Sequence, residues 1–178
     1  MRWKAFCAFS DNVNLNASLL GHTEPKVGGR SESQSTDNTE ISNIITQIYI
    51  MAFTAQQIEY VWSKGTKVPN YDPAKYRKDA CGAWIARDKY GDKHSPYGWQ
   101  IDHIYPESKL KLRSIDQESI DHPMNLRPMH WKNNVSKGSD YPAYHSIVKA
   151  VDNHNEDIDD TFEVNSKTQE ILRILYGI

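Results

Sequence analysis

YGWQIDHIY (residues 97–105) and NLRPMHWKNNVSKG (residues 125–138) are the stretches of this 178-residue chain that decide its fold. The first has the aromatic and branched residues typical of a β-strand, as does GAWIARD (residues 82–88) before it. We predict that these two strands pair as a β-hairpin. In the second stretch, residues 128–137 are predicted to form a short helix that stops near Gly138.

Asp102 and His103 lie next to each other near the end of the predicted strand. A carboxylate is a hard oxygen ligand suited to magnesium or manganese, and a histidine titrates near neutral pH. Asp102 is therefore predicted to bind metal and His103 to activate water for phosphodiester cleavage. Because neighbours on a strand point to opposite faces, both can reach one phosphate only where it passes over the end of the strand. Pro106, which follows shortly after, favours such an ending.

The predicted helix contributes the second half of the site. His130 and Asn134 are four residues apart, so on a helix they share a face where either could complete the coordination begun by Asp102. Contacts between basic side chains and backbone phosphates position a duplex without reading its sequence. Three residues of the same stretch are expected to make such contacts: Arg127, Lys132 and Lys137.

The Asp-His pair, the NLRP step and the terminal N-x-x-K-G together resemble the HNH endonucleases, whose motif is a ββα hairpin and helix around one metal ion. The resemblance covers roughly residues 80–141. It implies that Asp102 is the first metal ligand and His103 the general base. It implies that Asn125 fixes the connecting loop and orients the histidine. Asn134 would be the final metal ligand, as in the HNH domain of RNA-guided nucleases.

The chain departs from the family pattern at two places. Many members carry CxxC cysteines around this helix to bind zinc, whereas His130 and Asn133 occupy the matching positions here, so no structural zinc is expected. His130 is similar to an additional histidine ligand of the colicin-type nucleases, and Asn133 is the competing ligand if the register of Asn134 slips by one. The second departure is the length and charge of the loop formed by residues 107–121.

The organisation of the chain indicates one domain and an extension. Residues 21–40 are polar and rich in Gly, Ser and Thr, which is typical of a disordered linker. We expect residues 1–50 to be a mostly disordered or dispensable extension. Residues 51–178 are expected to form a small α+β domain of the ββα-metal (HNH, or His-Me finger) class with flanking helices. Its motif core is placed at residues 80–141 and its C-terminal helix at about residues 166–176.

Capping signals define two of these helices. Thr54 and Gln57 form a capping box for a helix over about residues 55–64. Ser166 and Gln169 have the same spacing ahead of the C-terminal helix.

Three further segments have weaker signals. Residues 74–80 are predicted to form a short helical turn and residues 106–123 a structured loop. The acidic run at residues 152–160 lacks the glycine and spacing of a calcium loop, so we interpret it as a solvated, flexible segment.

The distribution of charge fits a local nucleic-acid-binding site. The net charge of -2 and a pI near 6.4 give no basic field over the whole chain. Residues 64–149 nevertheless carry 15 Lys and Arg against 10 Asp and Glu, whereas residues 152–163 carry six acidic residues and no basic one. The excess positive charge therefore surrounds the motif.

The two cysteines, Cys7 and Cys81, form no CxxC pair, which argues against a disulfide framework and favours a reducing, cytoplasmic setting. Residues 1–20 lack the unbroken apolar run of a secretory signal, and no stretch approaches the length of a membrane span. We expect no export and no membrane partner.

The sequence therefore predicts a metal-dependent endonuclease that hydrolyses phosphodiester bonds, preferably in DNA, with RNA as the alternative substrate. One divalent cation is expected, Mg²⁺ ahead of Mn²⁺ or another transition metal. Two rival functions are a catalytically inactive nucleic-acid-binding module that retains the fold and a nuclease toxin domain. No oligomeric state is indicated.

Overall fold

The computed structural model describes residues 40–42 and 53–178. Residues 40–42 are helical. The expected extension over residues 1–50 otherwise lies outside the described residues. Residues 53–178 belong to one compact unit, and it is this unit that contains the candidate site.

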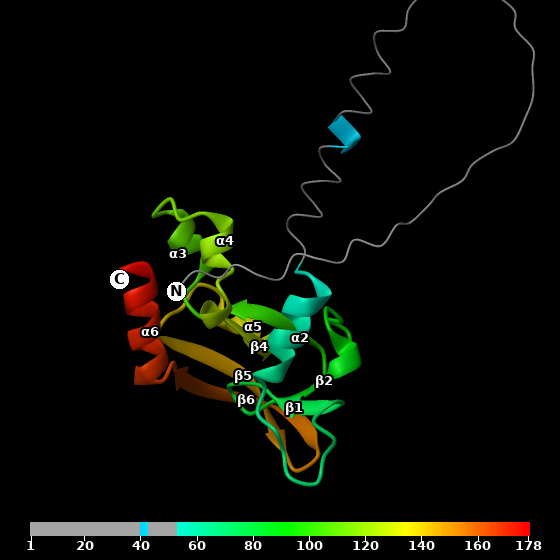
Figure 1. Ribbon diagram of the computed structural model, residues 1–178. Helices are drawn as coiled ribbons and strands as arrows, with labels where there is room; N and C mark the ends of the chain where they lie inside the picture. Colours follow the sequence, from blue (N-terminus) through cyan, green and yellow to red (C-terminus); the bar gives the residue numbers. More distant parts are fainter. Residues whose placement is uncertain (1–39, 43–52) are drawn as a thin grey trace, which may run out of the picture. The chain divides into compact units, whose positions relative to one another are not determined.

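Residues 53–178 form a mixed α+β fold that contains three two-stranded antiparallel sheets (Figure 1). The strands are β1 (Tyr76–Lys78), β2 (Trp84–Ala86), β3 (Trp99–His103), β4 (Leu126–His130), β5 (Ala143–Val151) and β6 (His154–Glu163). The helices are α2 (Ala55–Ser63), α3 (Glu107–Lys111), α4 (Gln117–Ile120), α5 (Trp131–Lys137) and α6 (Ser166–Tyr176), with short 3-10 helices η1 (Arg87–Lys89) and η2 (Pro123–Asn125). The predicted α+β class is confirmed.

The predicted hairpin between the second and third strands is wrong. β3 pairs with β4, from Trp99 opposite His130 to His103 opposite Leu126, and β2 pairs with β1. A tight hairpin needs a short turn. Instead η1 begins directly after Ala86 and turns the chain away from β2.

The helix predicted over residues 128–137 begins three residues later than expected. Residues 128–130 are the end of β4, and α5 starts at Trp131. The residue before a proline is biased toward an extended backbone, which favours strand geometry leading into Pro128. The imidazole of His130 then accepts a hydrogen bond from the backbone nitrogen of Lys132 and caps α5. His130 is thus the N-cap and does not share a helical face with Asn134.

Helix α5 follows β4 without a loop and lies against both β3 and β4. Its opposite side packs on β5. The motif is therefore a two-stranded ribbon with one helix across it, and β5, which pairs with β6, covers the far side of that helix.

Two buried apolar clusters hold the elements together. One contains Trp62 of α2 and Trp99 of β3, whose ring centroids are 5.2 Å apart. The other joins Met129 of β4 to Leu172 and Tyr176 of α6. Burial of such large side chains contributes roughly 1.5–3 kcal/mol each.

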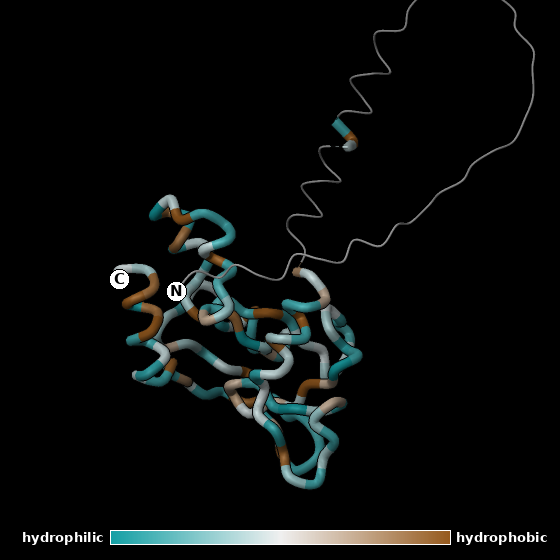
Figure 2. The backbone as a smooth tube through the Cα atoms, viewed as in Figure 1, coloured by the Kyte–Doolittle hydropathy of each residue, from teal (hydrophilic) through white to brown (hydrophobic). Residues whose placement is uncertain are grey.

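Both capped helices are present, one with a shifted cap. Thr54 and Gln57 form the predicted capping box of α2. α6 spans Ser166–Tyr176 as predicted, but its N-cap is Asn165, whose side chain accepts from the nitrogen of Thr168. Hydrophobic and hydrophilic residues alternate along α6, as its amphipathic sequence requires (Figure 2).

Three segments differ from their predictions. β1 occupies part of residues 74–80, where a helical turn was predicted. α3 and α4 lie within residues 106–123, where a loop was predicted. The acidic run belongs to β6, which pairs along its length with β5 and keeps most of its side chains exposed. Because the carboxylates of β6 point to solvent, the acidic sequence is compatible with the pairing of its backbone with β5.

Among residues 40–42 and 53–178, no helix combines the length and the apolar character needed to cross a bilayer.

Candidate active site

A groove of about 500 Å³ lies at the end of β3 and is lined by Asp102, His103 and Asn134. Glu107 and Ser108 of α3 line it from another side. Three of the residues predicted to act together thus face one space, although Asn134 comes from a different element. Asp102 and His103 both reach it because β3 ends at His103, as the strand-end argument requires.

Asp102 is buried, and both of its carboxylate oxygens are paired. Oδ2 accepts from Arg127 Nε at 2.7 Å, and Oδ1 lies 3.0 Å from Lys137 Nζ. Lys137 Nζ also donates to the carbonyl of His103 at 2.9 Å. Burial lowers the pKa of Lys137, and the charge of Asp102 opposes that lowering. The carboxylate of Asp102 is thus shared by two basic side chains.

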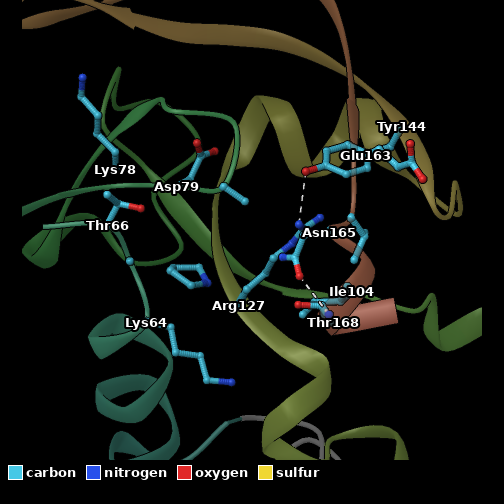
Figure 3. Close-up of a pocket in the computed structure, with 14 residues that line it drawn as sticks. Lys64, Thr66, Lys78, Asp79, Ile104, Arg127, Tyr144, Glu163, Asn165 and Thr168 are labelled. Atoms are coloured by element: carbon cyan, nitrogen blue, oxygen red, sulfur yellow. Dashed lines mark hydrogen bonds between the residues drawn. The ribbon is translucent and has the colours of Figure 1, made fainter. Parts of the chain in front are cut away.

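The three basic residues predicted to contact phosphates differ in their surroundings. Arg127 and Lys137 are turned toward Asp102, and Arg127 also donates to the hydroxyl of Tyr144 at 3.2 Å (Figure 3). Lys132 is exposed and pairs with Asp157 of β6 at 2.9 Å. The structure therefore does not place Arg127 and Lys137 as free surface cations.

The imidazole of His103 is held by a carboxylate on the opposite side of the loop. His103 Nε2 lies 2.7 Å from Asp121 Oδ1, and His103 Nδ1 lies 4.0 Å from Glu107 Oε2. The ring of Phe53 lies against it, with centroids 6.1 Å apart. Asp121 was not predicted as a site residue because 18 residues separate it from His103 and it lies in the segment interpreted as a loop. Its position between His103 and Asn125 is the one sequence signal that points to it.

Asn125 lies at the base of the loop and not in the groove. Its side chain is fully buried, and Nδ2 donates to the carbonyls of Tyr105 and Ile120 at 3.1 and 3.2 Å. Oδ1 accepts from the nitrogen of Tyr105 at 2.7 Å. Asn125 thus joins the backbone that follows His103 to the backbone that precedes Asp121.

Adjacent asparagines on α5 face opposite ways. Asn134 lines the groove, and its Nδ2 donates to Gln100 Oε1 at 3.1 Å. This bond uses the amide nitrogen of Asn134 and not its amide oxygen. Asn133 is fully buried, where it accepts from the nitrogen of Val148 and the hydroxyl of Ser146. Of the two alternatives left open by the sequence, Asn134 is the one that the structure brings to the groove.

His130 is not brought to this groove. Its Nε2 lies 3.0 Å from the carbonyl of Pro96, and its Nδ1 accepts from Lys132. It lines a separate pocket with Pro96 and Asn155. Burial lowers the pKa of His130, which favours the neutral ring, and both ring nitrogens already have partners.

Asp79 is a buried carboxylate that the sequence did not single out. It accepts from the nitrogens of Cys81 and Ala83, and from the backbone of His130 and the side chain of Asn133. Burial raises the pKa of Asp79. Its four partners tie the turn between β1 and β2 to α5, so Asp79 supports the helix that carries Asn134.

A second cavity of about 460 Å³ lies on another side of the ribbon and is lined by Lys64, Arg127 and Thr168, among others (Figure 3). Lys64 Nζ donates to the carbonyls of Pro123 and Leu126, and burial lowers the pKa of Lys64 to about 8. Arg127 is likewise turned to Asp102 and Tyr144, although its Nη2 is buried without a hydrogen-bond partner among the residues that the structure describes.

The groove residues fit a hard cation with few protein ligands. Within residues 40–42 and 53–178 no three His, Cys, Asp or Glu side chains gather as a metal site. Magnesium commonly uses one or two carboxylates and keeps several waters. Asp102 offers a carboxylate in which each oxygen retains a lone pair beyond its present bond, and Asn134 offers an amide oxygen. Mg²⁺ or Mn²⁺ suits these oxygen donors better than zinc.

In comparisons with protein-family models, curated proteins and solved structures, nothing matches this chain. Its function is therefore inferred from its own residues.

Proposed function

We propose that the protein is a metal-dependent endonuclease of the ββα-metal (HNH) class that hydrolyses phosphodiester bonds, with DNA as the preferred substrate. The observation that carries this proposal is the groove in which Asp102, His103 and Asn134 meet. The order of β3, β4 and α5 supports it, because a ribbon and the helix after it bring the three side chains together.

Each residue has a role that follows from its contacts. His103 takes a proton from water at the ring nitrogen that is not bonded to Asp121. Asp102 and Asn134 would hold a divalent cation through their oxygens. Such a cation supplies stabilisation of the charge that develops on the phosphate and the leaving oxygen. Asn125 fixes the loop behind the base through Tyr105.

The test is cleavage of supercoiled plasmid by purified protein with Mg²⁺, Mn²⁺ or a chelator. His103→Ala, purified in the same way, controls for contaminating nucleases. We expect nicking or linearisation that requires the cation and is about 10²-fold or more slower in His103→Ala. Cleavage of equal rate by His103→Ala would overturn the role of this residue, and an intact plasmid under every cation would overturn the enzyme.

One observation favours a second function, a non-catalytic nucleic-acid-binding module with the same fold. Arg127 and Lys137 pair with the two oxygens of Asp102, and these ion pairs stabilise the fold without any metal ion. In that case the plasmid is retarded on a gel and stays uncut with Mg²⁺ and Mn²⁺.

A further inference from the structure

We infer that Asp121 is a positioning residue for His103, which holds the imidazole in the tautomer that carries its proton on Nε2 and leaves Nδ1 facing the groove as the proton acceptor. The inference rests on the proposed function of His103 as general base. It adds a residue that the family resemblance did not supply.

The first support is the geometry of the pair. His103 Nε2 and Asp121 Oδ1 are 2.7 Å apart, which is short for a hydrogen bond between nitrogen and oxygen. An ionised carboxylate can only accept, so the imidazole nitrogen must donate. In a neutral ring the other nitrogen then has a free lone pair.

The second support is that Asp121 is itself held in place. Its Oδ2 accepts from Gln117 Nε2 at 3.1 Å, so each carboxylate oxygen has its own partner. The residue before it, Ile120, is fully buried, and the carbonyl of Ile120 accepts from Asn125 Nδ2. Tyr176 donates its hydroxyl to the carbonyls of Ser119 and Ile120. These contacts hold the carboxylate of Asp121 in place independently of His103, so the carboxylate fixes the orientation of the imidazole ring.

The third support is the surroundings of the other nitrogen. Nδ1 is 4.0 Å from Glu107 Oε2, beyond hydrogen-bond distance. Glu107 is instead paired with Lys111 at 2.6 Å. Glu107 and His103 both line the groove, so a water beside Nδ1 would lie in the space where the substrate is proposed to bind.

The experiment reads the tautomer directly, without cleavage. The full chain is labelled with ¹⁵N-histidine, the signals of His103 are assigned by their loss in His103→Gln, and spectra are recorded at about pH 9, where an ordinary histidine is neutral. We expect the wild-type ring to show a protonated Nε2. In Asp121→Asn the new side-chain amide can donate a hydrogen bond to Nε2. The neutral ring then carries its proton on Nδ1, as happens when the aspartate of a Ser-His-Asp triad is replaced by asparagine. Asp116→Asn is the matched control, because it removes a charge from the same helix while asparagine can still cap Ser119.

The expected result is a change of tautomer in Asp121→Asn and none in Asp116→Asn. A proton on Nδ1 in the wild type, or an unchanged tautomer in Asp121→Asn, overturns the inference. If Asp121→Asn does not fold, Asp121→Ala removes the acceptor of Nε2 altogether and should give a mixture of tautomers. A single unchanged tautomer in folded Asp121→Ala would then count against the inference.

A cleavage assay on the same samples separates this inference from the proposed function. We expect Asp121→Asn to lower kcat by about 10²-fold or more with little change in KM, because the base then presents the wrong nitrogen. A wild type that shows the expected tautomer but cuts no DNA refutes the nuclease proposal alone. A wild type that cuts DNA while its tautomer ignores Asp121→Asn refutes the positioning role alone.

Discussion

Asp102 and Arg127 face each other across β3 and β4, and Arg127 Nε donates to the Asp102 carboxylate at 2.7 Å inside the domain. Lys137 completes the cluster from α5. Asp102, the residue proposed to hold the metal ion, is therefore also the counter-charge of the buried Lys137 and of the largely buried Arg127. Its substitution should affect folding as well as cleavage.

Asp102→Ala should lower the free energy of unfolding by about 3–5 kcal/mol, because the buried Lys137 and the largely buried Arg127 then lose their counter-charge. Urea denaturation of the apo protein with chelator measures this loss. Lys132→Ala is the control, since its exposed pair with Asp157 contributes at most about 1 kcal/mol. Equal losses in the two variants would show that the Asp102 cluster does not stabilise the fold.

The two neighbouring asparagines of α5 should separate stability from activity. Asn133→Ala should lower the free energy of unfolding by about 2–4 kcal/mol, because Ser146, Val148 and Asp79 lose a buried partner. Asn134→Ala should cost less than about 1 kcal/mol and abolish cation-dependent cleavage. Denaturation measures the stability of both variants, and plasmid cleavage measures their activity. The reverse pattern would make Asn133, and not Asn134, the proposed metal ligand.

Asn125→Ala should destabilise the domain by roughly 3 kcal/mol. The loss arises because the nitrogen and carbonyl of Tyr105 and the carbonyl of Ile120 are left without their side-chain partner. Thermal unfolding detects it. A melting temperature equal to that of the wild type would mean that water replaces the amide without cost.

His103→Ala should reduce cleavage by about 10²- to 10⁴-fold, the usual contribution of a general base. Its effect on the melting temperature should be small, because the ring belongs to neither of the two buried apolar clusters. Single-turnover cleavage and calorimetry on one preparation give both values. A large fall in melting temperature would make the loss of activity uninformative.

Cys81 should react slowly with thiol reagents until the chain unfolds. Burial raises the pKa of Cys81 from its usual 9.0 to about 11, so little thiolate forms near neutral pH. Since the unfolded thiol ionises at lower pH than the folded one, its contribution to stability should fall as the pH rises from about 9 to about 11. Labelling and denaturation of Cys7→Ser, in which Cys81 is the remaining cysteine of the sequence, test both statements. Rapid labelling of the native protein at pH 7 would contradict them.

Local signals predicted the elements whose ends are marked by capping residues. Thr54 and Gln57 define α2 in the sequence and in the structure. β3 was predicted as a strand, but its partner was not, because pairing with β4 depends on contacts across more than 20 residues that no local pattern records. The strand character of β4 was concealed for the same reason, since the strand that it pairs with is β3.

The site was predicted in part for a similar reason. Asp102, His103 and Asn134 were predicted from the Asp-His pair and the later N-x-x-K-G, and the structure brings all three to one groove. The inward orientation of Arg127 and the pairing of Asp121 with His103 depend on burial and on the path of the loop, which residue types alone do not reveal.

The amide of Asn125 ties together the two ends of the segment between Tyr105 and Ile120. Ser114, near its exposed tip, has a left-handed backbone with φ of 58°. Since Asn125 joins the two ends of the segment, an insertion or deletion around Ser114 need not change the position of the His103 imidazole. The tip is thus a position where related chains can differ in length, and where a label or peptide can be grafted, while the pairing of His103 with Asp121 is preserved.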